Sequence, residues 1–266
     1  MRFTREPVDV GGGVGRLFLP GLCDVGRLGL MTLQSLLMFP SQLLPGRWRE
    51  VVRQMYLMGI KSLPVITIVG MFTGMVLGLQ IGLELRRYNQ EVFIGAGVMI
   101  SSLREMGPFM TGLILAACVG SSMAAQIGTM TVNDEVAALE TMSIDPVRYL
   151  VAPRMTAMVL MTPVLSFYAC VLSVIGGGVV AVTQLSVPFT QYMKVAMDTA
   201  VAHDLYVGLL KALVFGVVIT GLSCFEGFST RQGAVGVGRA TRDSVVKSFV
   251  LILIIGYIIT RLFYDL

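Results

Sequence analysis

Arg104 and Glu105 are the strongest candidates for chemistry, because these two ionisable residues stand side by side in a largely apolar stretch. Ionisable residues are rare in membrane-spanning helices and usually mark a function there. Neighbours on a helix point about 100° apart, so each residue needs a partner other than its neighbour. The Arg104 guanidinium suits a lipid phosphate or a group on a second copy of the chain. Alternatively, the two residues form a fixed polar clamp before Pro108.

A short acidic segment, Asp134 to Ser143, is the second candidate. Asn133 is expected to cap a helix there and Pro146 to stop it. Its apolar residues recur every three positions and would insert into a groove, whereas its carboxylates lie off that stripe and would meet basic groups. The alternative is a solvated cytoplasmic turn. The predicted docking residues are Asp134, Glu135, Val136, Leu139, Glu140 and Met142.

Composition places these residues in a membrane protein, since 55% of the 266 residues are hydrophobic, 14% are charged, and the mean hydropathy is +0.79. There is no phosphate-binding loop for nucleotide hydrolysis and no serine nucleophile elbow. His203 is the single histidine, expected in an external loop, and cannot build a zinc site alone. The four cysteines lack paired spacing, so we expect no disulfide and no metal.

Stretches poor in charge predict an all-α fold with five membrane-spanning helices, because about 20 residues cross a bilayer core. The third run, Met155 to Met193, is too long for one span, so its helix should end near Val182. Gln184 to Asp204 would then be external, with a short helix after Pro188. The expected spans are Ser62 to Leu83, Met106 to Asn133, Met155 to Val182, Leu205 to Phe225 and Ser248 to Tyr264.

Residues 92–133 would reach roughly 60 Å as one helix, about twice the hydrocarbon thickness. We therefore expect Gly107-Pro108 to break or kink this helix. The part before it, Val92 to Leu103, is too short to span and is interpreted as a partial entry into the membrane.

Basic residues set the orientation, because they accumulate in cytoplasmic segments. They gather before the first span and after the fourth, which predicts a cytoplasmic N-terminus, a cytoplasmic acidic helix and a C-terminus on the opposite side of the membrane. An interfacial helix is expected within Leu17 to Leu44, and no cleaved signal peptide. The predicted division is a cytoplasmic or interfacial segment, 1–50, and a membrane-spanning domain, 51–266. The basic residues are Arg2, Arg5, Arg16, Arg27, Arg47, Arg49, Arg53 and Lys61, then Arg231, Arg239, Arg242 and Lys247.

Four blocks carry a family resemblance: LREMGP, VGSSMAAQIGTM, EVAALETMSIDPVRYLVAPR and GAVGVGRATRDSVVKS. Between Leu63 and Phe263 the chain resembles the MlaE family, the permease subunits of ABC transporters that move phospholipids together with MCE proteins. Ala117-Cys118 departs from the family, where a Gly-Arg pair is common.

The resemblance implies a homodimer in a Gram-negative inner membrane, serving outer-membrane lipid asymmetry. It implies two ATPase subunits that bind ATP and Mg²⁺, a hexameric periplasmic ring of MCE-domain protein and a small cytoplasmic regulatory subunit. The chain itself would be no enzyme and would bind no cofactor. Phospholipid would sit at the dimer interface near the first two spans, with Arg104 and Glu105. Six positions on the first span have intervals that suit an acyl-chain pocket, and ordinary helix packing explains these intervals equally well. They are Val69, Phe72, Thr73, Val76, Leu77 and Gln80.

Two other classes of function are alternatives to a permease. An ion-coupled secondary transporter usually has inverted repeats and broken helices in matched positions, and five unequal spans do not show them. A membrane-embedded lipid enzyme would need a nucleophile or a metal constellation, and the sequence contains neither pattern.

Overall fold

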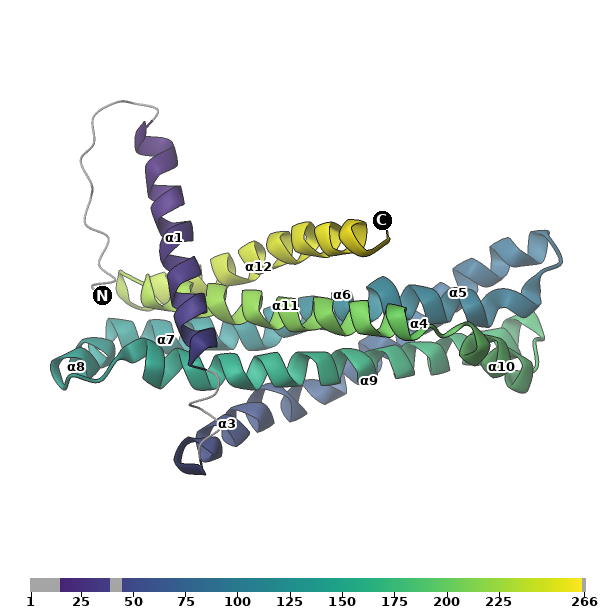
Figure 1. Ribbon diagram of the computed structural model, residues 1–266, viewed down its shortest axis with the longest axis horizontal. Coiled ribbons are helices and arrows are strands. Elements are labelled where there is room, and N and C mark those ends of the chain that lie inside the picture. The colour runs from purple at the N-terminus through teal and green to yellow at the C-terminus, as the bar shows by residue number, and fades with distance from the viewer. Residues whose placement is uncertain (1–14, 39–44, 265–266) are drawn as a thin grey trace. The chain divides into compact units, whose positions relative to one another are not determined.

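The computed structural model describes residues 15–38 and 45–264, with side chains from 26–38 and 48–264, and every regular element in these residues is a helix (Figure 1). The helices are joined in places by 3₁₀ turns, Ile60–Ser62 and Glu91–Phe93, and by π-helical turns, Ser102–Met106, Ala116–Gly120 and Val147–Val151. The α-helices are α1 Gly15–Leu37, α3 Pro45–Met58, α4 Leu63–Arg87, α5 Ile94–Ser101, α6 Gly107–Leu115, α7 Ser121–Val132, α8 Glu135–Thr141, α9 Ala152–Leu185, α10 Phe189–Thr199, α11 Ala202–Phe228 and α12 Gly233–Tyr264.

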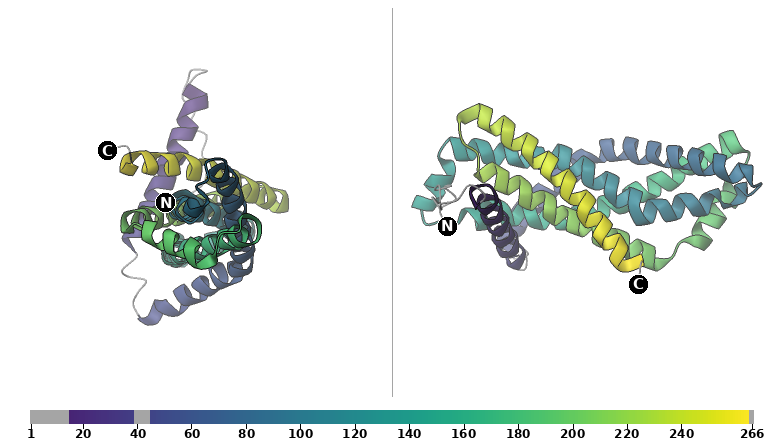
Figure 2. Two further views of the ribbon diagram at one scale, coloured as in Figure 1. Left: turned by 90° about the vertical axis from the view of Figure 1, so that its right-hand side faces the viewer. Right: turned by 90° about the horizontal axis from the view of Figure 1, so that it is seen from above.

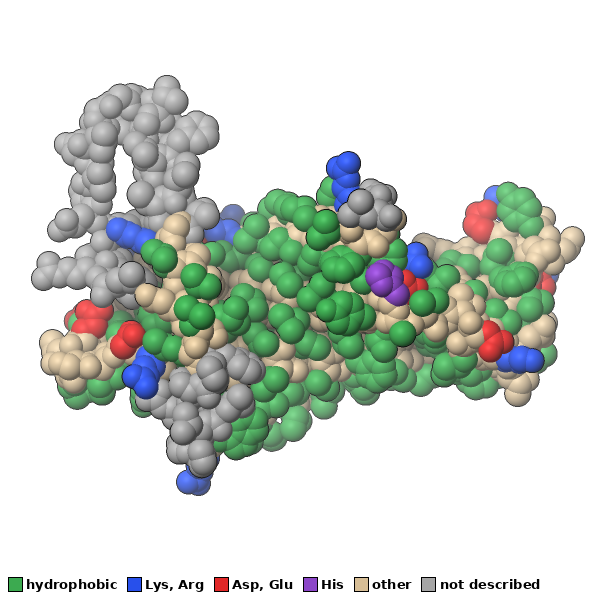
Figure 3. Space-filling model, in the orientation of Figure 1, with side chains coloured by type: hydrophobic (Ala, Val, Ile, Leu, Met, Phe, Trp, Pro, Cys, Tyr) green, Lys and Arg blue, Asp and Glu red, His purple; other side chains and the backbone are tan. Residues whose placement is uncertain are grey.

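Five helical runs in the described residues are long and apolar enough to cross a membrane, which confirms the predicted all-α, five-span fold. Hydrophobic side chains cover most of the face seen in Figure 3, and charged ones are few. The chain is thus a multi-pass membrane protein. The runs are Trp48–Arg87, Glu91–Val132, Val147–Leu185, Ala202–Phe228 and Gly233–Tyr264.

Several predicted helix ends are wrong. The fifth span begins at Gly233 instead of Ser248, because its first turns place charged residues on the exposed face while Ala240 and Ser244 are buried. Such an amphipathic segment continues a helix without being apolar throughout. Similarly, α4 continues past Leu83 to Arg87. The third span does end near Val182, since α9 ends at Leu185. The short helix predicted after Pro188 is confirmed as α10.

The helix does not break at Gly107-Pro108, because it continues from α5 into α6, and the kink expected as the alternative stays a prediction. A π-helical turn, Ser102–Met106, immediately precedes the proline, and the Gly107 N–H donates to the Ser102 carbonyl. The wider turn accommodates the missing proline N–H, which would end or kink an ordinary α-helix. Val92 to Leu103 is therefore continuous with the second span and not a separate crossing.

The chain forms two compact units, and α9, α11 and α12 contribute residues to both. Of the described residues, the first unit contains those within 1–57, 116–158 and 217–249, and the second contains those within 58–115, 159–216 and 250–266. The predicted division at residue 50 falls inside α3, and it stays a prediction.

In the second unit, α4 packs closely on α9 through a stripe of glycines. A Cβ at Gly78 would lie 2.9 Å from the Gly177 Cα, and one at Gly74 would overlap the Ser173 carbonyl. Small residues at such spacing let two helix backbones approach, which is a principal source of helix association in lipid. The buried α4 residues are Ile66, Gly70, Gly74, Gly78 and Gly82.

Helix α10 lies beside α5 in the same unit (Figures 1 and 2). Its Tyr192 is fully buried, and the hydroxyl donates a hydrogen bond of 2.9 Å to the Val174 carbonyl of α9. Burial raises the pKa of the Tyr192 phenol. The protonated phenol can donate this hydrogen bond, which links α10 to α9.

The core of the first unit joins α1, α7, α8 and α11. Met31 of α1 and Ile127 of α7 are buried against Phe225 of α11 and the π-helical turn Val147–Val151. Helix α1 therefore covers most of the range Leu17 to Leu44, in which an interfacial helix was predicted. The end of that range, 39–44, lies outside the described residues. Its interfacial location stays a prediction.

Candidate functional site

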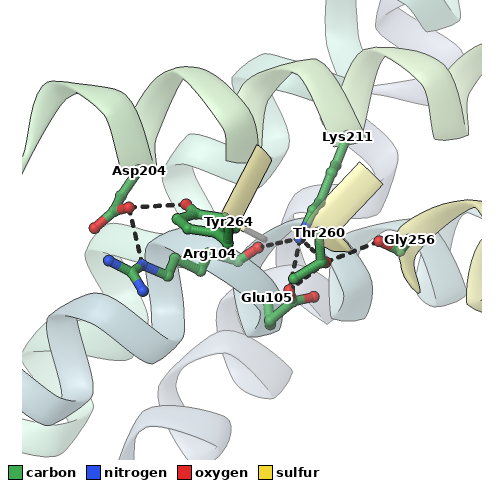
Figure 4. A network of polar contacts seen from close by, with 7 residues as sticks. All are labelled: Arg104, Glu105, Asp204, Lys211, Gly256, Thr260 and Tyr264. Carbon is green, nitrogen blue, oxygen red and sulfur yellow. Dashed lines mark hydrogen bonds and ion pairs between the residues drawn. The ribbon is translucent and has the colours of Figure 1, made fainter. Parts of the chain in front are cut away.

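A buried lysine lies at the centre of a polar cluster in the second unit (Figure 4). Only 1% of the Lys211 side chain, on α11, is exposed. Its Nζ lies 2.6 Å from Glu105 Oε1, 2.7 Å from Thr260 Oγ1 and 2.8 Å from the Arg104 carbonyl. An ammonium has three donors, so each hydrogen has an acceptor. This pairing is what allows a charge to be buried.

The proline after the π-helical turn explains why a lysine is useful here. In an α-helix, the N–H of residue 108 would donate to the Arg104 carbonyl, and Pro108 has no N–H. Lys211 donates to that carbonyl instead. The Thr260 hydroxyl lies 2.7 Å from Glu105 Oε1 and 2.8 Å from the Gly256 carbonyl, and its one proton serves one acceptor at a time.

Arg104 has a separate set of partners. Its Nε lies 2.8 Å from Asp204 Oδ1, and its guanidinium carbon lies 4.5 Å from the centroid of the Tyr264 ring. The Tyr264 hydroxyl is 2.8 Å from the same Asp204 oxygen. The Asp204 side chain is 3% exposed and that of Arg104 is 39% exposed. The guanidinium therefore pairs with a buried carboxylate on one side, and part of the Arg104 side chain remains accessible.

The prediction that Arg104 and Glu105 have different partners is confirmed. The geometry is that of a polar clamp, which joins the second span to α11 and to the end of α12. His203, expected in a loop, lies in the first turn of α11 with its ring edge-on to Tyr264.

A cavity of about 280 Å³ opens beside this clamp. Glu105, Lys211 and Thr260 form its polar part, and the remainder is aromatic and aliphatic. The Glu105 side chain is 42% exposed, so the polar part is accessible. The cavity can therefore accept a molecule with both polar and apolar groups. The apolar lining residues are Phe109, Phe215, Ile252, Leu253, Gly256 and Tyr257.

The six predicted acyl-chain positions on the first span do not line this cavity. They lie on α4 away from its buried glycine stripe, and Phe72 and Val76 are among its most exposed residues. This face is open to acyl chains or to another helix, and its role in lipid binding stays a prediction. The six are Val69, Phe72, Thr73, Val76, Leu77 and Gln80.

The acidic helix differs from its prediction in two respects. Its N-cap is Asp134, with a left-handed backbone (φ +60°) and no side-chain capping hydrogen bond, whereas Asn133 ends α7. Val136 and Leu139 pack into the core of the first unit. The prediction that these two residues insert into a groove is therefore wrong where it places that groove on a partner. Met142 is exposed. The carboxylates Asp134, Glu135 and Glu140 are also exposed, and their docking role stays a prediction.

The sequence reasoning missed the partners of the clamp. Lys211 interrupts the otherwise apolar fourth span, and a lone lysine in such a helix is a signal of a buried ion pair that could have found this partner. Asp204, Thr260 and Tyr264 carry no such signal, because their proximity to the second span arises only on folding.

Comparison with known proteins places this arrangement in a family. Residues 51–262 match the family model "Permease MlaE". A probable ABC transporter permease protein of Rickettsia prowazekii is 40% identical over 238 residues, which cover 89% of this chain and 92% of that protein. The intermembrane phospholipid transport system permease protein MlaE of Haemophilus influenzae is 33% identical over 241 residues, covering 90% and 92%. A probable ABC transporter permease protein of Synechocystis is 34% identical over 217 residues, covering 82% of each. The chain belongs to the MlaE permease family.

Proposed function

We propose that this chain is the permease subunit of an ABC transporter that moves phospholipids between the inner and outer membranes of a Gram-negative bacterium, maintaining outer-membrane lipid asymmetry. The observation that carries the proposal is the similarity to the Haemophilus influenzae phospholipid permease along 90% of the chain. The five apolar helices and the mixed polar and apolar cavity support it.

In this proposal the cavity beside Glu105 and Lys211 holds part of the phospholipid. Its aromatic and aliphatic walls suit an acyl chain, and the polar part suits the glycerol or headgroup. The partly exposed guanidinium of Arg104 would contact the phosphate while Asp204 holds the other side of the same group. Arg104 would thus serve as both clamp and ligand.

The proposed assembly contains two copies of this chain, two ATPase subunits, a hexameric periplasmic MCE-domain protein and a small cytoplasmic regulatory subunit. ATP and Mg²⁺ would bind to the ATPase, since this sequence has no phosphate-binding loop. The exposed carboxylates of α8 support docking of the ATPase on the cytoplasmic side. The distribution of basic residues favours a cytoplasmic N-terminus and a periplasmic C-terminus.

Reconstitution in proteoliposomes tests the function. We expect transfer of a fluorescent phospholipid to the MCE-domain protein or to acceptor vesicles only when the chain, its ATPase and ATP are all present. A matched ATPase variant that binds ATP without hydrolysing it should abolish transfer. Transfer driven by an ion gradient without the ATPase would overturn the proposal in favour of a secondary transporter.

Arg104→Ala tests the lipid contact in the same system. We expect less co-purified phospholipid and slower transfer, measured by mass spectrometry and fluorescence. Asp204→Asn is the matched control, because it weakens the clamp but leaves the guanidinium in place. Unchanged lipid content and transfer in Arg104→Ala would remove the ligand role of this residue.

A further inference from the structure

A second cavity, of about 570 Å³, lies entirely within the first unit. Helix α3, the loop after α8, the π-helical turn Val147–Val151 and the start of α9 enclose it. Three arginines from three of these elements line it: Arg53, Arg148 and Arg154. The cavity at Glu105 and Lys211 has different lining residues and belongs to the second unit.

Arg154 is the unusual member of the three, because its charge is buried and incompletely paired. The residue is 7% exposed, and its Nη2 donates to Gln126 Oε1 at 3.2 Å. Its Nε and Nη1 are enclosed and have no hydrogen-bond partner within the described part of the chain. Nor is an acidic side chain of that part ion-paired with it. Buried cations without a counter-charge are unfavourable, and buried unsatisfied donors are rare.

The two carboxylates of the lining are engaged elsewhere. Glu50 accepts a hydrogen bond from Gln54 at 2.7 Å and lies 3.6 Å from Arg53 Nη1. Asp145 accepts a hydrogen bond from the Val147 backbone N–H at 3.0 Å. Neither compensates Arg154, so the cavity retains an excess of positive charge and fits an anion.

The surroundings of the cavity point to a lipid as the source of that anion. Two candidate spans begin beside it, Trp48–Arg87 and Val147–Leu185. Exposed aromatic side chains stand at both beginnings, Trp48 on one and Tyr149 on the other. Tryptophan and tyrosine concentrate at the membrane–water interface, and basic pockets between spans bind phosphate-bearing headgroups.

We propose that this cavity binds the phosphate of an anionic phospholipid as a resident lipid, separate from the transported one. Arg53 and Arg148, both exposed, attract the headgroup at the rim. A phosphate on the cavity floor offsets the Arg154 charge across a short, poorly solvated distance. A rotation of the guanidinium then allows its free nitrogens to donate to the phosphate oxygens, as arginine does in bidentate pairs.

Lipid binding to the purified full-length chain tests the proposal. Binding of phosphatidylglycerol is measured by native mass spectrometry in detergent, with phosphatidylcholine and inorganic phosphate as comparison probes. Because Arg53 and Arg148 are exposed, the variant Arg53→Gln/Arg148→Gln should fold. We expect its Kd for phosphatidylglycerol to rise at least about tenfold, since each lost contact is a charge-assisted hydrogen bond. Arg154→Gln should show a similar or larger rise.

The matched control is Arg86→Gln/Arg87→Gln, which removes the same charge from exposed positions at the end of α4. Its Kd should stay within about twofold of the unaltered chain. Equal binding of phosphatidylcholine, or an unchanged Kd in Arg53→Gln/Arg148→Gln, would overturn the proposal. Displacement of the lipid by millimolar inorganic phosphate would assign the oxyanion site to free phosphate instead. Loss of ATPase co-purification with unchanged lipid binding would show a protein-docking surface and also overturn it.

Discussion

Replacing Lys211 by methionine tests whether its ammonium holds the second unit together. Methionine has a similar length and is apolar, so the substitution removes the charge and the three donors with little change in packing. It leaves Glu105 without its cation and removes the donor that Lys211 supplies to the Arg104 carbonyl. We therefore expect the free energy of unfolding to fall.

The expected loss is about 3 kcal/mol. Removing one partner of a buried ion pair costs about 3 to 5 kcal/mol, because the other charge is left uncompensated. The Glu105 side chain is 42% exposed and can regain some hydration, which places the loss at the low end of that range. Thr260→Val removes one neutral hydroxyl and should cost only about 1 kcal/mol.

A double-mutant cycle makes this prediction specific to the pair. Unfolding is measured in mixed micelles by titration with sodium dodecyl sulfate and followed by far-ultraviolet circular dichroism. Glu105→Gln combined with Lys211→Met should cost about 1 to 2 kcal/mol less than the sum of the single variants, because no buried charge remains uncompensated. A loss below 1 kcal/mol for Lys211→Met, or strict additivity, would refute the reasoning.

Three further predictions concern packing, docking and topology. Gly74→Ala should lower stability in the same titration by several kcal/mol or prevent folding, because its Cβ would overlap the α9 backbone. Glu135→Lys with Glu140→Lys should weaken co-purification of the ATPase but leave membrane insertion intact, because exposed carboxylates are reversed. A cysteine at Gln90 should react with an impermeant thiol reagent from the periplasm, whereas one at Ala234 should not.

Each of these has an internal control. Gly238 is a helical glycine in open space, so Gly238→Ala should be neutral or stabilising, and equal effects at both glycines would contradict the packing argument. Intact ATPase attachment and full lipid transfer would remove the docking role of α8. The cysteine variants are made with Cys118, an exposed thiol, changed to Ser, and reversed labelling would contradict the orientation.

The spans could be predicted from the sequence because an apolar run of bilayer length has few alternatives in a membrane. Their ends could not, because amphipathic turns extend α4 and α12 into charged sequence without ending the helix. The glycines of α4 recur every four residues in the sequence, but their partner on α9 follows only from the fold.

The site was predictable only in part for the same reason. Arg104 and Glu105 were conspicuous as charges in an apolar stretch, and their different directions follow from helix geometry. Their partners come from α11 and α12, far along the chain. The helical period of Val136 and Leu139 could be recognised in the sequence. An apolar face that packs against the chain's own core has the same period as one that docks on a partner protein, so the period could not distinguish the two.

Photocrosslinking at the cavity mouth tests the central claim most directly. Tyr257 lines the cavity and is exposed, so a photoreactive benzoylphenylalanine at this position should form an adduct with phospholipid. In the complex with its ATPase, we expect the yield to change when ATP is hydrolysed, because cargo passes through the site. Tyr206, exposed and outside the cavity lining, is the matched control and should give a constant yield with bulk lipid. Equal yields at Tyr257 with and without ATP hydrolysis would contradict the assignment of this cavity to transported phospholipid.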